Sequence, residues 1–145
     1  MEKDKRIGLA INTASRLFRR RVDNALNSRC EEKITGMQGF IIGFLSRNSD
    51  KDMFQRDIEK EFSIRRSTAT SILQLMEKND LITREPFEKD ARLKKIVLTE
   101  KSLRRHKIFT EEIDFLEQKL YSGLTEKEKS EFFRIIEKIK ANIGE

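Results

Sequence analysis

DARLKKIVLTEK, residues 90–101, is the most informative segment of this 145-residue chain. Its central part, Lys94–Thr99, is short and rich in β-branched residues, which is typical of a strand. Leu81–Arg84 is a second short segment of the same kind, and a polar stretch that contains Pro86 separates the two. The pattern predicts a β-hairpin with an exposed tip that runs from Pro86 to Arg92.

Two short helices are expected immediately before the hairpin. The first covers residues 54–62 and the second about 65–78, and Ser63–Ile64 interrupts the helical pattern between them. Asn79–Asp80 offers a left-handed exit from the second helix, because short polar side chains tolerate that conformation. Two short helices joined by a tight turn and followed by a hairpin are the plan of a winged helix-turn-helix.

Longer amphipathic helices flank this region. Apolar residues recur every three or four positions over about 5–28 and 100–143, and Gly123 divides the second stretch. Thr35–Gln38 and Thr125–Glu128 have the spacing of capping boxes, which indicates that helices begin there. The expected fold class is mainly α with a small two- or three-stranded β wing. A single domain, 1–145, would hold a winged helix-turn-helix lobe at about 35–99 between long N- and C-terminal helices.

Composition narrows the possible functions. Lys and Arg total 31 against 25 Asp and Glu, and the net charge of +6 points to a polyanion such as nucleic acid or to an acidic membrane surface. One cysteine and one histidine leave no disulfide framework, ordinary metal site or nucleophile–base pair, so we expect no enzyme, metal or cofactor. The apolar stretch 36–45 is too short for a bilayer and no apolar signal core follows the charged N-terminus, so we expect a cytoplasmic protein without membrane contact.

The second short helix has an exposed face suited to DNA. No Asp or Glu occurs from Ser63 to Met76, so nothing there repels a phosphate backbone. Such a helix fits the major groove, and a cationic hairpin tip fits the adjacent minor groove. The candidate contacts are Arg65, Arg66, Ser67, Thr68, Thr70, Ser71 and Gln74 on the helix, and Lys89, Arg92, Lys94 and Lys95 on the hairpin.

These segments resemble the MarR family of bacterial winged-helix transcription regulators. Residues 90–101 match the family's wing and its second strand, and Arg84 precedes them at the expected place. Asp80 and Ser102 stand where the family often has glycine. Further support comes from the segments 55–58, 67–73 and 76–82.

The resemblance implies a homodimer built from dimerisation helices at about 5–28 and 100–143. It implies recognition helices in successive major grooves of a pseudo-palindromic, double-stranded DNA operator, with Arg92 in the minor groove. It also adds Arg84 and Asp90 to the candidate DNA-binding residues, with Asp90 pairing with the arginines of the wing. Members of the family often bind a small aromatic effector between the dimer helices and the DNA-binding lobe, for which the candidate residues are Phe18, Phe44, Phe109 and Phe115.

The sequence therefore predicts a sequence-specific regulator of transcription, a repressor released by a small-molecule effector. The alternative is a winged-helix protein- or ligand-binding module that has lost DNA binding, and the absence of acids from Ser63 to Met76 argues against it. Cys30 is interpreted as an incidental small side chain rather than a redox sensor, because it lies at or past the end of the first helix. His106 lies among basic residues and is expected at the surface.

Overall fold

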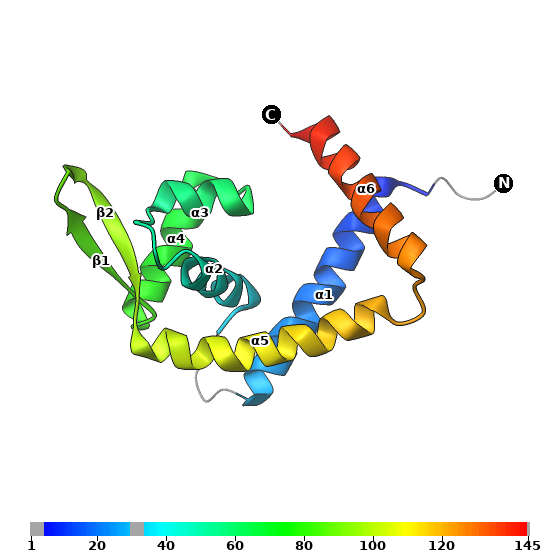
Figure 1. Ribbon diagram of the computed structural model, residues 1–145, viewed down its shortest axis with the longest axis horizontal. Helices are drawn as coiled ribbons and strands as arrows, with labels where there is room; N and C mark the ends of the chain where they lie inside the picture. Colours follow the sequence, from blue (N-terminus) through cyan, green and yellow to red (C-terminus); the bar gives the residue numbers. More distant parts are fainter. Residues whose placement is uncertain (1–4, 30–33, 145) are drawn as a thin grey trace. The chain divides into compact units, whose positions relative to one another are not determined.

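The computed structural model describes residues 5–29 and 34–144, and this part of the chain contains six helices and a two-stranded antiparallel sheet (Figure 1). The expected fold class, mainly α with a small β wing, is confirmed. The helices are α1 (Ile7–Arg29), α2 (Gly36–Arg47), α3 (Gln55–Phe62), α4 (Arg66–Lys78), α5 (Glu100–Tyr121) and α6 (Glu126–Ile143). The strands are β1 (Ile82–Phe87) and β2 (Asp90–Leu98).

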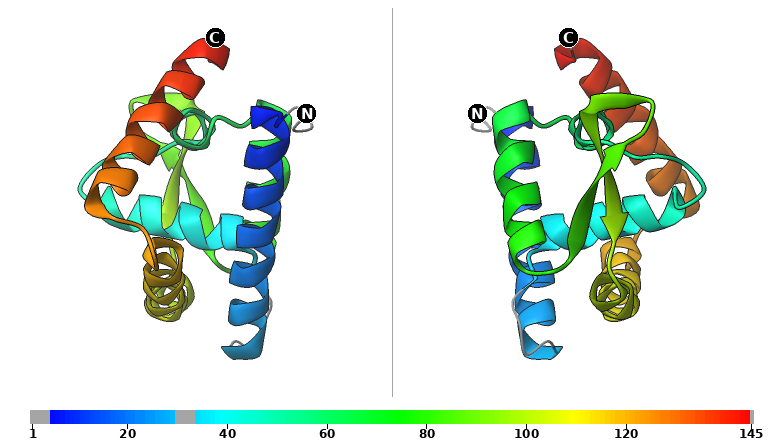
Figure 2. Two further views of the ribbon diagram at one scale, coloured as in Figure 1. Left: turned by 90° about the vertical axis from the view of Figure 1, so that its right-hand side faces the viewer. Right: turned by 90° about the vertical axis from the view of Figure 1, so that its left-hand side faces the viewer.

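The chain forms two compact units, Met1–Glu112 and Ile113–Glu145, with the boundary inside α5. In the first unit α2 packs on α1 and β2, while α4 packs on α3 and β1. Figure 2 shows this unit from two sides, with α2 lying crosswise to α4. Its core includes the fully buried side chains of Leu26, Ile41, Ile42, Ile58, Leu73, Met76, Leu81 and Ile82.

The helix-turn-helix forms as expected, and local interactions explain its boundaries. The Asp57 carboxylate accepts a hydrogen bond from the Phe54 backbone N–H at 2.8 Å, which satisfies a free donor at the start of α3. Ser63 ends α3 in the left-handed region at φ 49°. Asp80 leaves α4 in the same region at φ 58°, so an aspartate takes the conformation that family members often give to glycine.

The hairpin, called the wing below, differs from the prediction at its tip. Both strands are longer than expected, so only Glu88 and Lys89 form the turn, and the residues from Asp90 onward belong to β2. Phe87 pairs with Asp90 but Pro86 pairs with Lys94, so the register shifts and β2 carries three extra residues there. The shift explains the difference, because it lets a strand continue through Pro86, which has no N–H to donate.

The start of α5 is fastened to the end of α4. Thr99 caps α5, since its hydroxyl accepts from the Ser102 N–H at 3.3 Å. The same hydroxyl donates to the Asp80 carbonyl at 2.6 Å. Ser102 is fully buried and donates to the Thr99 carbonyl at 2.8 Å, which satisfies a polar group where a glycine is common in the family.

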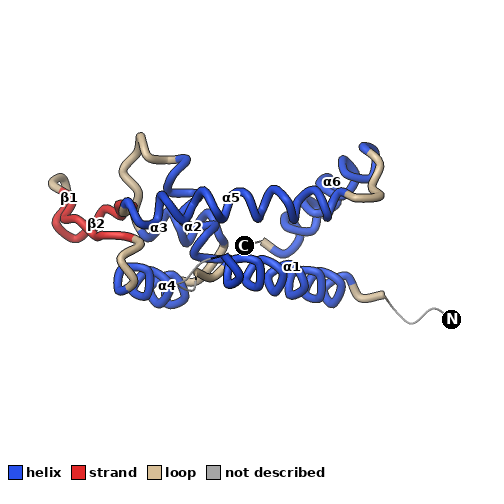
Figure 3. Tube along the Cα trace, turned by 90° about the horizontal axis from the view of Figure 1, so that it is seen from below, coloured by secondary structure: helices blue, strands red, loops and turns tan. Residues whose placement is uncertain are grey.

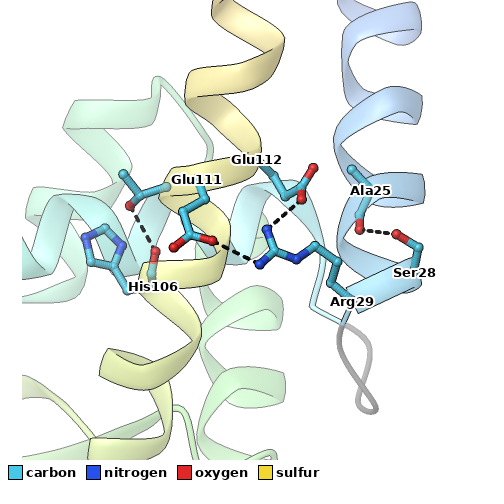
Figure 4. Close-up of polar contacts among 7 residues, drawn as sticks. Ala25, Ser28, Arg29, His106, Glu111 and Glu112 are labelled. Carbon is cyan, nitrogen blue, oxygen red and sulfur yellow. Dashed lines mark hydrogen bonds and ion pairs between the residues drawn. The ribbon is translucent and has the colours of Figure 1, made fainter.

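α1 has an apolar face that the rest of the first unit leaves largely uncovered. Only Val22 and Leu26 are buried, whereas Ile7 is 61% and Leu17 54% exposed. At its C-terminal end, Arg29 joins α5 through ion pairs with Glu112 at 2.7 Å and Glu111 at 2.9 Å (Figure 4).

His106 lies on α5 near the same ion pairs, with its ring drawn in Figure 4. The residue is half-buried rather than fully exposed, and its Nδ1 atom is inaccessible to water. A Cβ added at Gly43 of α2 would stand 3.5 Å from the His106 ring, so the ring packs against that helix.

The second unit consists of the end of α5 and of α6. Gly123, at φ 80°, makes the turn between them, and Thr125 and Glu128 form the predicted capping box of α6. α6 has no buried residue, and Phe132 and Phe133 are 57% and 52% exposed. In the described ranges no helix combines the length and the apolar character needed to cross a membrane.

Candidate nucleic-acid interface

The outer face of α4 is polar and open to solvent. Figure 3 shows α3 and α4 at the same end of the first unit as the wing. Thr70 is half-buried on this helix. The Ser71 hydroxyl donates to the Ser67 carbonyl at 3.1 Å, so the Ser71 proton is already engaged. The other predicted contacts on this helix are exposed: Arg65, Arg66, Ser67, Thr68 and Gln74.

A hollow of about 510 Å³ lies between α3, α4 and the wing. We call it the cationic hollow, because five of its lining side chains are positively charged and one, Glu59, is negatively charged. The cations come from all three elements and are Arg56, Arg66, Arg84, Arg92 and Lys94. The structure thus brings together four predicted cations and adds Arg56, which was not predicted.

Gln55 ties the two helices together at this hollow. Its Nε2 amide donates to the Thr70 hydroxyl at 2.8 Å and to the Arg66 carbonyl at 3.3 Å. Gln55, Arg56 and Glu59 were missed as site residues, although residues 55–58 belong to the segments that resemble the family. Their position on α3 gives no charge run, and only the packing of α3 against α4 brings them to the site.

The wing is anchored to the start of α3 by aromatic contacts. The Phe54 and Phe87 rings meet edge to face with centroids 4.9 Å apart, and the Arg56 guanidinium lies 5.1 Å from the Phe54 centroid. Edge-to-face rings and cations over rings are both favourable arrangements. These contacts hold the wing beside the helix-turn-helix.

Arg92 projects from the wing, and its side chain is 90% exposed. Asp90 accepts from the Arg92 backbone N–H at 3.0 Å and from its Nε at 3.3 Å, so the pairing implied by the family resemblance is present. These hydrogen bonds hold the pKa of Asp90 below its ordinary value of 3.8. The carboxylate therefore stays ionised above that value, and the pair weakens only as the pH falls through the lower folded pKa.

Two predicted wing cations lie away from the hollow. Lys89 is exposed in the turn. Lys95 points to the other side of β2, where its ammonium pairs with Asp52 at 3.0 Å and lines a separate cavity of about 370 Å³. The neighbours Lys94 and Lys95 therefore face opposite sides, as successive residues of a strand do.

The candidate effector residues do not converge on one site. The Phe18 and Phe109 rings both contact Phe40, with centroids 6.4 and 5.2 Å away, whereas Phe44 packs on the Phe62 ring at 5.9 Å. A cavity of about 140 Å³ beside Phe18 is smaller than the roughly 300–1,000 Å³ of usual ligand pockets. The fourth candidate, Phe115, belongs to the second unit and is 55% exposed.

The described part of the chain contains no candidate metal site. There, no three His, Cys, Asp or Glu side chains converge as a metal ion would require. Cys30 lies outside the described residues.

Comparison with known proteins places this geometry in a family. The model of the MarR family matches residues 33–93, which include the helix-turn-helix and the cationic hollow except for Lys94. Comparison with curated proteins gives no match.

Solved structures resemble the chain over nearly its whole length. The transcription regulator MarR from Oenococcus oeni is 35% identical with a TM-score of 0.76, and the match covers 92% of this chain and 98% of that one. MepR from Staphylococcus aureus, solved with DNA, is 25% identical with a TM-score of 0.87, covering 98% and 99%. The heme sensor PefR from Streptococcus agalactiae, solved with heme, is 25% identical with a TM-score of 0.68, covering 97% and 95%. The chain belongs to the MarR family of winged-helix transcription regulators.

Proposed function

We propose that this protein is a homodimeric, cytoplasmic regulator that binds a pseudo-palindromic DNA operator and represses transcription until a small-molecule effector releases it. α4 is the recognition helix for the major groove, and the wing reads the adjacent minor groove. The proposal includes no catalytic activity.

One observation carries the proposal. From Arg66 to Met76 α4 carries no carboxylate, and two of its residues, Arg66 and Thr70, line a hollow in which five cations outnumber one carboxylate. A double helix is a polyanion, and proteins that bind it place cations on its phosphates and polar side chains on its base edges. The solved complex of the related MepR with DNA supports the same use of this fold.

Exposed apolar surface supports the dimer. Ile7 and Leu9 of α1 are 61% and 64% exposed, and Phe132 and Ile143 of α6 are 57% and 77% exposed. Large apolar side chains that no residue of one chain covers mark an interaction surface. A second copy that covers them would set two recognition helices one DNA turn, about 34–36 Å, apart.

Release by an effector would act through the first unit of the protein. The small cavity beside Phe18 lies between α1 and α2, and a ligand that enlarges it would bias the dimer toward a spacing that no longer matches the operator. PefR, solved with heme, is a relative with a bound small molecule. The effector proposed here is a small aromatic compound.

The proposal is tested by selecting bound sites from random duplexes with the purified protein. We expect sites with dyad symmetry, bound with an affinity that falls steeply with salt because several phosphates are neutralised. An Arg92→Ala variant should bind the selected site about 1–3 kcal/mol more weakly and remain a dimer. Arg104→Ala removes an exposed arginine of α5 that does not line the hollow and serves as the matched control.

Failure of the selection would favour the alternative of a winged-helix protein- or ligand-binding module that has lost DNA binding. In that case the duplexes recovered would show no common sequence, and retention would not depend on Arg92. Unchanged affinity of Arg92→Ala alone would remove only the wing arginine from the interface.

A further inference from the structure

Arg84 has buried hydrogen-bond donors that no described residue satisfies. Its Nε and Nη2 atoms are buried, and neither has a hydrogen-bond partner in the described part of the chain. A charged donor that loses water without gaining an acceptor is strongly unfavourable. Arg84 shares a face of β1 with the buried Ile82, and its side chain lines the cationic hollow.

Apart from Glu59, the charged side chains that line the hollow are hydrogen-bond donors, and Thr70 is also arranged to donate. The Thr70 hydroxyl accepts its hydrogen bond from Gln55 Nε2 at 2.8 Å, which leaves its proton available for another acceptor. Arg66 and Lys94 line the hollow without an ion pair to any described residue. The hollow therefore suits a ligand that carries negative charge and only accepts hydrogen bonds.

The position of the hollow indicates where such a ligand comes from. In any duplex a sugar–phosphate strand separates a major groove from the adjacent minor groove. If α4 lies in the first groove and the wing in the second, that strand must pass between them, where the hollow is found. A phosphate has only acceptor oxygens, whereas base edges present both donors and acceptors.

We propose that the cationic hollow holds one backbone phosphate of the DNA strand between the two grooves, in each subunit. Arg84 and Thr70 bind the phosphate, and Gln55 is a positioning residue that turns the Thr70 proton toward it. This inference rests on the DNA binding proposed above and goes beyond it by assigning these residues to the backbone instead of to base reading. Contacts to phosphate fix the register of the protein but carry no sequence information, so their loss affects all duplexes alike.

The first experiment uses the full-length protein and its Arg84→Met variant, which keeps an unbranched apolar stem. Affinities are measured by fluorescence anisotropy for a selected operator and for a scrambled duplex of equal length, over a series of KCl concentrations. We expect both affinities to fall about tenfold or more at 0.15 M salt, as for the loss of a charge-assisted hydrogen bond. The ratio of the two affinities should stay the same, and the salt slope should shrink by about one phosphate per subunit.

The second experiment locates the phosphate with wild-type protein, so it does not depend on how the variant folds. Single methylphosphonate linkages, which are uncharged, are placed one at a time along each half of the operator. We expect one uncharged linkage between the two grooves to lower the affinity of the wild-type protein. The same linkage should cause no further loss of affinity in Arg84→Met. A further measurement compares inorganic phosphate with chloride at equal ionic strength as competitors of DNA binding. If the hollow binds a free phosphate, phosphate should displace the DNA more effectively than chloride.

Gln55 is tested through its coupling to Thr70. Gln55→Leu and Thr70→Val should each lower the affinity for both duplexes several-fold. The affinity of the double variant should be no lower than that of the weaker-binding single variant, because both substitutions remove the same donor. Glu59→Gln should instead raise the affinity for both duplexes, since it removes the one carboxylate of the hollow.

Three results would overturn the inference while leaving the proposed function intact. The first is a loss confined to the operator, which would make Arg84 a base reader. The second is an unchanged salt slope in Arg84→Met. The third is that no single methylphosphonate linkage between the two grooves lowers the affinity of the wild-type protein. Failure of the wild-type protein to bind either duplex would instead refute the proposed function.

Discussion

Gly39 in α2 tests how tightly the helices of the first unit are packed. A Cβ atom at this position would stand 2.2 Å from Phe109 Cε2 and 2.3 Å from Cδ2, far inside the ~3.5–4.0 Å that carbon atoms prefer. Phe109 is only 6% exposed, and its ring meets Phe40 edge to face at 5.2 Å. The ring therefore has no free space to move into when a methyl group is added.

The expected effect of Gly39→Ala is the balance of two opposing terms. Alanine in a helix interior is favoured over glycine by about 1 kcal/mol. Overpacking a well-packed core is unfavourable by about 1–3 kcal/mol. We expect the variant to lose about 0–2 kcal/mol in the free energy of unfolding, centred near 1 kcal/mol, which lowers the Tm by about 2–4 °C in a chain of this size.

Urea and thermal unfolding at one fixed protein concentration measure this loss, because the apparent stability of a dimer depends on concentration. Gly8→Ala is the matched control, since nothing lies within 4 Å of its added Cβ, and it should be neutral or slightly stabilising. Phe109→Leu removes the closest ring atom, so Gly39→Ala should be less harmful in that background, with a coupling of about 0.5–3 kcal/mol. An unfolding free energy above that of wild type, unchanged by Phe109→Leu, would refute the packing argument.

Two further substitutions test local interactions. Thr125→Ala removes the side chain that accepts from the Glu128 N–H at 3.2 Å, so the unfolding free energy should fall by about 1 kcal/mol, whereas Thr125→Ser should keep most of it; equal losses in both would contradict a capping role. Arg29→Gln breaks the pairs with Glu112 and Glu111, in which the arginine side chain is 40% exposed, so the loss of stability should be small and should shrink in 1 M NaCl. Arg20→Gln, at an exposed position of α1, is its control, and a loss that persists in high salt would point to packing rather than charge.

The elements that sequence predicts well are those specified by their own neighbours. The left-handed exit at Asp80 and the capping boxes of Thr35 and Thr125 all depend on interactions within a few residues. The wing tip was placed wrongly for the opposite reason. The shift between Pro86 and Phe87 depends on how two strands pair, and residue-by-residue β propensity carries no information about pairing.

The same distinction holds for the candidate interface. Arg66, Thr70, Arg92 and Lys94 were predicted from the polar helix face and from the wing, and Arg84 from the family resemblance. All five meet in the cationic hollow. The contribution of α3 was missed, because it arises only when one helix packs on another. The apolar periodicity of α1 predicted an apolar face correctly but not what covers it, since a pattern cannot distinguish an internal core from a contact with a second chain.

Arg84 connects the stability of the free protein with its proposed activity. The buried Nε and Nη2 atoms, which have no partner among the described residues, disfavour the folded state, so an apolar side chain of similar length would be better for stability alone. Retention of such a group is understandable if a bound phosphate supplies the missing acceptors, because the unfavourable term is then removed only in the complex. Arg84→Met should therefore move two measured quantities in opposite directions, with an unchanged or higher Tm for the free protein and weaker binding to every duplex. A lower Tm together with unchanged DNA affinity would mean that Arg84 serves the fold itself.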